Sequence, residues 1–348
     1  TATTEIYTLS LNDALPISAN DNLSPSYVTQ LHAAELVLWS GMLGDLGEDI
    51  HVTLRLSPEQ SVHQSVFDSV KNEILLGYKI PTMNPVHRSV ILAHEFGHAV
   101  FQQHFSFSLG ETRVSYQDVV DMGKKDLAFI REDQAYQDLA REIMEIEKTV
   151  TMAKQVGHQE LISDLTRLLQ TKNDEQSAMT PRWNSFLALR SFLIPYNELF
   201  ADSLPVLIWK NPRAITEALH DPKETYLEAV QRFLLYGGKN RRHIDEARTF
   251  KIIPFKDWQT EIASAYTLLD PARGVLWNLF IKNLEVADIP TYMKTHLQAT
   301  EEHMNLRFKR GEDPENEKTY ASPTQLNQEF VRIFVRLAKK NGLKISKS

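Results

Sequence analysis

Apolar residues recur every three or four positions along most of this chain, which is the spacing of an amphipathic α-helix. The first such stretch starts at Pro25, a residue suited to a first helical turn, and continues to about Trp39. Nearer the C-terminus, the same spacing predicts helices over 258–269, 271–284, 290–308 and 323–340. Further helix starts are indicated at Asn211-Pro212 and Asp221-Pro222. The chain is therefore expected to be mostly helical.

Two stretches near the N-terminus alternate between apolar and polar residues, which is the pattern of a half-buried β-strand. They cover residues 49–56 and 73–80, and prolines at positions 58 and 81 stop them. We therefore expect a small sheet in this region. An edge strand of that sheet could bind an extended peptide through its backbone, or the sheet could be scaffold alone.

The middle of the chain carries a long and highly charged helical pattern. Its apolar stripe runs through 118–154 and continues over 160–169, and Glu and Lys cover the remaining positions. Such charge is more typical of a solvated helix face than of a binding site. We interpret 172–177 as a polar linker. Thr180-Pro181 is expected to restart a helix, and Pro195 to open another.

An apolar helix that opens at Pro85 and runs to about His104 contains the sequence His94-Glu95-Phe96-Gly97-His98. His94 and His98 lie one turn apart on one helix face, so both imidazoles can reach one Zn²⁺ at about 2.0–2.1 Å. Glu95 lies one step round the helix and can take a proton from a water at that metal. The alternative is a buried helix with two satisfied core histidines. The apolar surroundings disfavour it, because these polar groups would be costly there without a partner.

A catalytic zinc usually takes three protein ligands, and two residues are candidates for the third. His104 lies six residues after His98, but on a continuing helix it is about 120° from the ligand face and about 9 Å further along. Glu198 is the better candidate, and Asp202 follows it on the same face of a second apolar helix. We expect Glu198 to bind the metal and Asp202 to hold the free N–H of a ligand histidine. A solvated carboxylate pair is disfavoured by the apolar flanks.

With these motifs the chain resembles the gluzincin metallopeptidases, the thermolysin-like clan. Their pattern is H-E-x-x-H on one helix and a glutamate on a later helix, often as N-E-x-x-[SA]-D. The matching positions here are His94, Glu95, His98, Asn197, Glu198 and Asp202. The resemblance covers the two motifs and the helix-rich region between them. It implies a zinc cofactor and the hydrolysis of peptide or protein substrates.

The resemblance also implies a later His or Tyr that stabilises the oxyanion of the tetrahedral intermediate. The candidates are His220, Tyr236, His243 and Tyr266. His243 is the first choice, because Asp245 could orient it and the adjacent arginines could meet a substrate carboxylate. The alternative for His243 is an ordinary surface histidine in a basic loop. Arg273 is a weaker candidate for the same cleft.

The expected fold is α+β and predominantly α-helical, with a zincin-like core, a small N-terminal β-sheet and a helical C-terminal region. We assign 18–84 to the N-terminal helix and sheet, 85–210 to the metal-binding core, and 211–348 to the C-terminal region. Residues 111–172 would be a charged helical insertion in the core, as a lid or a wall of the cleft. Residues 1–17 look like a translated sequencing adapter, and we expect them to be an assembly artefact.

Composition narrows the classes of function. The net charge of −7 over 348 residues, without a dense basic patch, argues against a nucleic-acid partner. The absence of Cys excludes disulfides and thiolate zinc sites, and no apolar run is long enough to cross a bilayer. The compartment and the oligomeric state stay undecided, and a secreted or periplasmic bacterial setting is a guess. A zinc hydrolase acting on non-peptide substrates and a non-catalytic zincin-fold binding module are the alternatives, and Glu95 counts against the second.

Overall fold

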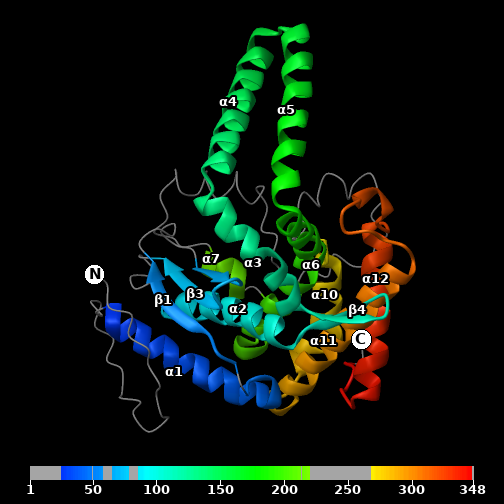
Figure 1. Ribbon diagram of the computed structural model, residues 1–348. Coiled ribbons are helices and arrows are strands. Elements are labelled where there is room, and N and C mark those ends of the chain that lie inside the picture. The colour runs from blue at the N-terminus through cyan, green and yellow to red at the C-terminus, as the bar shows by residue number, and fades with distance from the viewer. Residues whose placement is uncertain are drawn as a thin grey trace. The chain divides into compact units, whose positions relative to one another are not determined.

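A computed structural model describes residues 25–48, 50–57, 65–77, 85–212, 214–219 and 268–346 of the chain. These residues are mostly helical, with a three-stranded mixed sheet and a two-stranded hairpin, so the expected α+β class is confirmed (Figure 1). The described residues fall into two compact units: one from 1–116 and 192–348, the other from 117–191. None of the described helices combines the length and the apolarity needed to cross a membrane.

The first unit begins with α1 (Pro25–Leu43) and a three-stranded sheet of order β1-β3-β2. β1 (Thr53–Ser57) is parallel to β3 (Glu73–Gly77), and β2 (Ser65–Asp68) runs antiparallel to β3 along its other edge. The sequence predicted both β1 and β3. The stretch predicted over 49–56 starts before β1 does, and the stretch predicted over 73–80 extends beyond the described residues. The sequence did not predict β2, whose four residues are too few for their alternation to stand out.

The predicted motif helix is α2 (Pro85–His104), and both of its ends match the prediction. All its side chains from Arg88 to Gln102 are buried. The side chain of Gln102 donates a hydrogen bond of 2.9 Å to the carbonyl of Ser69, which ties α2 to the turn after β2. A hairpin of β4 (Ser106–Leu109) and β5 (Thr112–Ser115) follows and turns at Gly110, whose φ is +64°. The sequence did not predict this hairpin.

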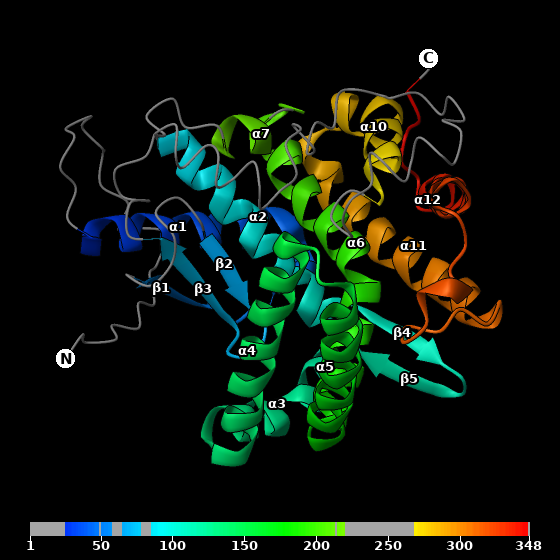
Figure 2. The same cartoon turned by 90° about the horizontal axis from the view of Figure 1, so that it is seen from above.

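The second motif lies on α6 (Pro181–Trp209), which continues through Pro195 and Pro205. The predicted helix start at Pro195 is therefore wrong. A proline inside a helix removes a hydrogen bond and crowds the preceding turn, but packing can outweigh this. From Phe192 onward α6 lies between α2 and α11 (Ile289–Lys309), as Figure 2 shows. Phe200 contacts Phe101 on one side and His296 on the other, with ring centroids 5.6 and 5.4 Å apart.

The described helices in the C-terminal part of this unit are α7 (Ala214–Leu219), α10 (Asp270–Leu279), α11 and α12 (Pro323–Lys340). The helices predicted over 290–308 and 323–340 are confirmed. The helix predicted over 271–284 is α10 and a short 3₁₀ turn, Ile281–Asn283. The helix predicted to start at 221 begins outside the described residues. The helix predicted over 258–269 lies outside them except for its last two residues.

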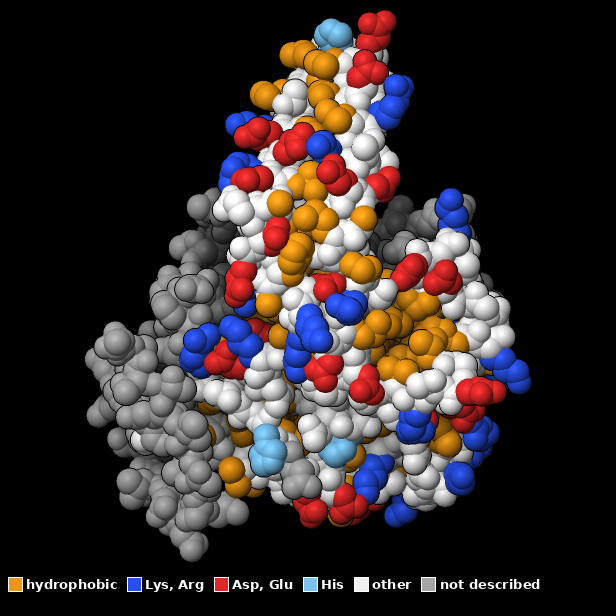
Figure 3. All heavy atoms as spheres, viewed as in Figure 1, with side chains coloured by type: hydrophobic (Ala, Val, Ile, Leu, Met, Phe, Trp, Pro, Cys, Tyr) orange, Lys and Arg blue, Asp and Glu red, His pale blue; other side chains and the backbone are white. Residues whose placement is uncertain are grey.

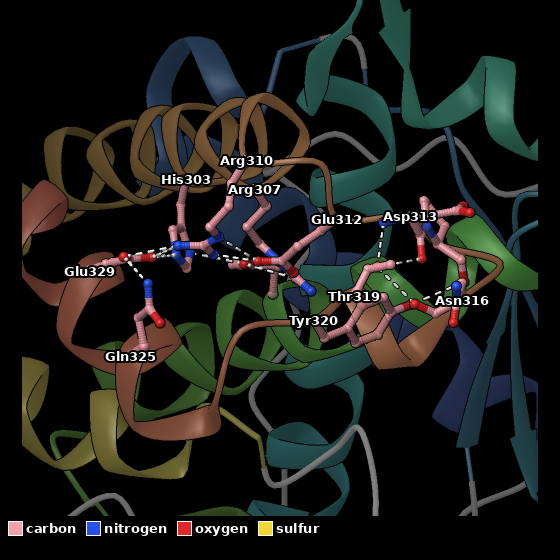
Figure 4. A network of polar contacts seen from close by, with 12 residues as sticks. His303, Arg307, Arg310, Glu312, Asp313, Asn316, Thr319, Tyr320, Gln325 and Glu329 are labelled. Atoms are coloured by element: carbon pink, nitrogen blue, oxygen red, sulfur yellow. Dashed lines mark hydrogen bonds and ion pairs between the residues drawn. The ribbon is translucent and has the colours of Figure 1, made fainter.

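A network of buried charges joins the end of α11 to α6 and to the loop before α12 (Figure 4). Nε of Arg307 donates to Glu312 at 2.7 Å, and its Nη1 donates to the hydroxyl of Tyr196 at 3.2 Å. That hydroxyl lies 2.9 Å from Nδ1 of His303. Burial lowers the pKa of His303 well below its ordinary value, so the neutral ring can accept this hydrogen bond. The network fixes the α6 turn that carries the second motif.

The second unit contains most of α3 (Tyr116–Glu132), all of α4 (Gln134–Val156) and α5 (Gln159–Met179), and the start of α6. The buried residues of α4 alternate in steps of four and three, the heptad spacing of a coiled coil: Leu139, Ile143, Ile146, Val150 and Ala153. Charged side chains border the apolar stripe of the α4–α5 hairpin in Figure 3. The predicted charged helices are confirmed, with a break at Asp133, whose carboxylate caps α4.

The linker predicted at 172–177 is wrong, because α5 continues to Met179. Residues of this stretch make contacts within the hairpin. The ammonium of Lys172 lies 3.2 Å from the carboxylate of Glu142 on α4 and 3.4 Å from that of Glu175. Polar composition alone therefore did not distinguish a linker from the exposed face of a coiled-coil helix.

Candidate metal centre

The two motif helices approach each other closely at a pair of small residues. A Cβ atom on Gly97 of α2 would lie 2.7 Å from the Cα of Ala201 on α6. Real Cβ atoms essentially never come this close to a neighbouring atom, so the glycine is needed for this approach. Gly97 and Ala201 thus allow the ligand faces of the two helices to meet.

At this crossing the structure brings together His94, His98 and Glu198, whose nearest ligand atoms lie within 4.8 Å of one another. The two Nε2 atoms are 3.0 Å apart, and the carboxylate oxygens of Glu198 lie 3.7 Å from His94 and 3.6 Å from His98. Ligands about 2.0–2.1 Å from a tetrahedral zinc are separated by about 3.3–3.4 Å. The three side chains are therefore spaced as the ligands of one metal ion.

The other ring nitrogen of each histidine has its own partner on α6. Nδ1 of His98 donates to Oδ1 of Asn197 at 2.9 Å, and Nδ1 of His94 lies 2.9 Å from Oδ1 of Asp202. Because both partners are acceptors, the proton of each neutral ring sits on Nδ1. Both Nε2 lone pairs then point to the same place as the Glu198 carboxylate. A cation satisfies three such acceptors together, and this donor set fits zinc.

The centre is buried, and its charges are arranged around Asp202. His94, His98 and Glu198 are 6–8% exposed, and Asp202 is completely buried. Nη2 of Arg273, from α10, lies 2.6 Å from Oδ2 of Asp202. A buried carboxylate is costly unless it is paired, and here a guanidinium on one side and an imidazole on the other provide the pairing.

Glu95 is held by the edge of the sheet. The backbone N–H of Phe67, in β2, donates to Oε2 of Glu95 at 2.8 Å. β2 is the outer strand of the described sheet, so this amide is on the side of the strand that β3 does not cover. The contact involves a backbone group in an unpredicted strand, and no side-chain motif could have revealed it.

The other residues that the sequence suggested for the site are not among the metal-ligand group. Nε2 of His104 lies 2.8 Å from the carbonyl oxygen of Leu46, and His104 does not belong to the metal-ligand group. Arg273 is 1% exposed and paired with Asp202, whereas the sequence suggested a place in the substrate cleft. The proposed oxyanion residues all lie outside the described residues: His220, Tyr236, His243 and Tyr266.

No protein-family model matches this chain, and no curated protein or solved structure is significantly similar to it. The chemistry of the site therefore has to be inferred from its own geometry. That geometry is a buried His-His-Glu group that could hold a metal ion, with a further carboxylate, Glu95, beside it.

Proposed function

We propose that the protein is a zinc-dependent peptidase of the gluzincin type, with His94, His98 and Glu198 as the metal ligands. The observation that carries the proposal is the convergence of two Nε2 lone pairs and one carboxylate, with both Nδ1 atoms already engaged. Two imidazoles and one carboxylate are a common ligand set of catalytic zinc, whereas Mg²⁺ and Ca²⁺ favour oxygen ligands. Zinc is therefore the metal that suits this site best.

The neighbouring glutamate supports a hydrolytic role over metal storage. Zinc, when bound, would polarise a substrate carbonyl and acidify water. Glu95 follows a ligand directly in the chain, and the amide of Phe67 fixes one of its oxygens. Its carboxylate would take the proton from the attacking water and pass it to the leaving amine. A site that only stored metal would need no such base.

The position of β2 favours a peptide as the substrate. An extended peptide can pair with the exposed edge of a sheet through backbone hydrogen bonds. β2 is the outer strand of the described sheet, and its Phe67 amide donates to Glu95, so a peptide would pair with the other backbone groups of this strand. A peptide paired along β2 would therefore pass beside the proposed base. The edge strand beside Glu95 is the feature that supports a peptide substrate.

Two substitutions separate metal binding from catalysis. Glu95→Gln should keep zinc and lower kcat/KM on a peptide library by about 10²–10⁴-fold, because it removes the base and leaves the ligands. His98→Ala should lose both zinc and activity. Zinc content by elemental analysis and cleavage by mass spectrometry give the two readouts. A zinc-free but active His98→Ala protein would contradict the scheme, and zinc binding without any peptide cleavage would favour a different zinc hydrolase.

A further inference from the structure

Arg273 is connected to the candidate metal centre by a continuous chain of polar contacts. Its guanidinium lies 2.6 Å from Oδ2 of Asp202, and Oδ1 of the same carboxylate lies 2.9 Å from Nδ1 of His94. The arginine is 1% exposed and the aspartate is completely buried. Each carboxylate oxygen therefore has a different partner: a cation on one side and the imidazole on the other.

The turn that carries Arg273 is itself fixed from α12. Asn327 is 1% exposed, and its Oδ1 accepts a hydrogen bond of 3.0 Å from the backbone N–H of Ala272. Its Nδ2 donates to the carbonyls of Leu268 and Pro323, at 2.7 and 2.8 Å. One amide side chain thus joins the start of α10 to the start of α12. The turn that presents Arg273 to Asp202 is therefore tied to α12.

We propose that Arg273 is a positioning residue of the metal centre, which acts on His94 through Asp202. This inference rests on the proposed function, since it assumes that His94 binds the metal. The ion pair holds the carboxylate in the orientation in which Oδ1 faces Nδ1 of His94. The imidazole is then fixed with Nε2 towards the other two ligands. Without the cation, Asp202 would be free to turn and the ring would lose its support.

The substitution that tests this role is Arg273→Met, which removes the cation and keeps a side chain of similar length. Loss of the support behind a ligand histidine typically weakens metal affinity by about 10–100-fold. We expect a loss of that size in zinc affinity, measured by competition with a chromophoric chelator. The visible spectrum of the Co²⁺-loaded protein should change as well, because it reports on ligand geometry. A conservative Arg273→Lys variant should recover part of the affinity, since it restores a cation.

Arg307 provides a matched control. It is also 1% exposed and makes a buried ion pair, with Glu312 at 2.7 Å, but it contacts neither Asp202 nor a proposed ligand. Arg307→Met should lower the thermal stability of the metal-free protein to an extent similar to Arg273→Met. It should reduce zinc affinity and change the Co²⁺ spectrum much less, because Arg307 reaches the second motif only through Tyr196, next in the chain to Asn197. An equal loss of zinc affinity in both variants would show a general structural effect and overturn the proposal.

A double-variant cycle tests whether the effect passes through Asp202. If it does, Arg273→Met should add little to the loss in zinc affinity already caused by Asp202→Asn. Wild-type zinc affinity in Arg273→Met would overturn the inference and leave the proposed function intact, whereas a wild-type protein that binds no zinc would overturn both. Should Arg273→Met fail to fold, Arg273→Gln takes its place, because it also removes the cation and keeps a polar side chain; an unchanged Co²⁺ spectrum in that variant would contradict the proposal.

Discussion

His94 and His98 are held in place by partners of different charge. Nδ1 of His98 meets the neutral amide of Asn197, whereas Nδ1 of His94 meets the carboxylate of Asp202, which Arg273 pairs from behind. A carboxylate partner makes an imidazole a stronger metal ligand than an amide does. We therefore expect the two histidines to contribute unequally to metal affinity.

The partner of His98 can be removed without touching a ligand. Asn197→Ala should weaken zinc affinity by about tenfold, at the low end of the range for such partners, because the ring loses its orientation. Asn184→Ala is the matched control on the same helix, since its amide donates only to the backbone of Ser177 at 2.7 Å. Competition titration with a chelator measures both. An Asn197→Ala protein with wild-type affinity would show that this hydrogen bond does not support the centre.

At the scale of the elements, the site depends on how closely α2 and α6 can approach. Gly97→Ala places a Cβ atom against the backbone of Ala201 and forces the helices apart. We expect a loss of stability of about 1–3 kcal/mol, typical of overpacking, and a weaker zinc site because Glu198 moves away from the histidines. Chemical unfolding and metal titration give the two values.

Gly41 in α1 is the control for the glycine substitution. A Cβ atom at Gly41 would meet nothing within 4 Å, so Gly41→Ala should leave zinc affinity unchanged. It should also stabilise the protein by about 0.5–1 kcal/mol, because alanine is the better helix former. If Gly97→Ala behaved like Gly41→Ala, the close approach of the two helices would not matter for the site.

The sequence predicted the elements whose signals are long and local. α2, α11 and α12 have apolar spacing over many turns and a proline at or near their first residue, and their ends fall within a residue or two of the prediction. β2 and the β4–β5 hairpin have strands of only four residues, too short for a pattern to emerge. At Pro195 a strong local signal was overruled by tertiary packing, which no local pattern records.

For the candidate site too, a local pattern does not record contacts between distant segments. The spacing within each motif revealed His94, Glu95, His98, Glu198 and Asp202, because a helix fixes which of these residues share a face. The contacts from Arg273 and from the Phe67 amide join segments far apart in the chain, and a single sequence carries no signal for such pairs. The sequence therefore predicted which side chains of the two motif helices belong to the candidate site. The structure added the contacts that orient them.

For the molecule as a whole, buried histidines make stability depend on pH. His296 is completely buried among aromatic rings, and burial lowers its pKa from 6.5 to about 3. The folded protein therefore keeps this ring neutral in a range where the unfolded chain takes up a proton. Because the unfolded state binds more protons between these values, stability falls as the pH falls, by roughly 1.4 kcal/mol per pH unit for this group.

His296→Phe should remove the contribution of this histidine to the loss of stability at acidic pH. Between about pH 6.5 and about pH 4.5, the metal-free wild type should lose about 2 kcal/mol more of its unfolding free energy than the variant loses. Urea titrations at the two pH values, with a chelator present, measure the difference. If both proteins lost the same amount, the ring would not be held neutral by burial.

The most direct test of the account is the metal content of the purified protein and of Glu198→Ala, by elemental analysis. The wild type should contain about one zinc per chain and the variant far less, because three protein ligands would be reduced to two. Glu73→Ala is the control for removing a buried carboxylate, since Glu73 is 7% exposed and Glu198 is 8% exposed. That control should keep its zinc. Full zinc content in Glu198→Ala would contradict the proposed ligand set, and with it the proposed peptidase.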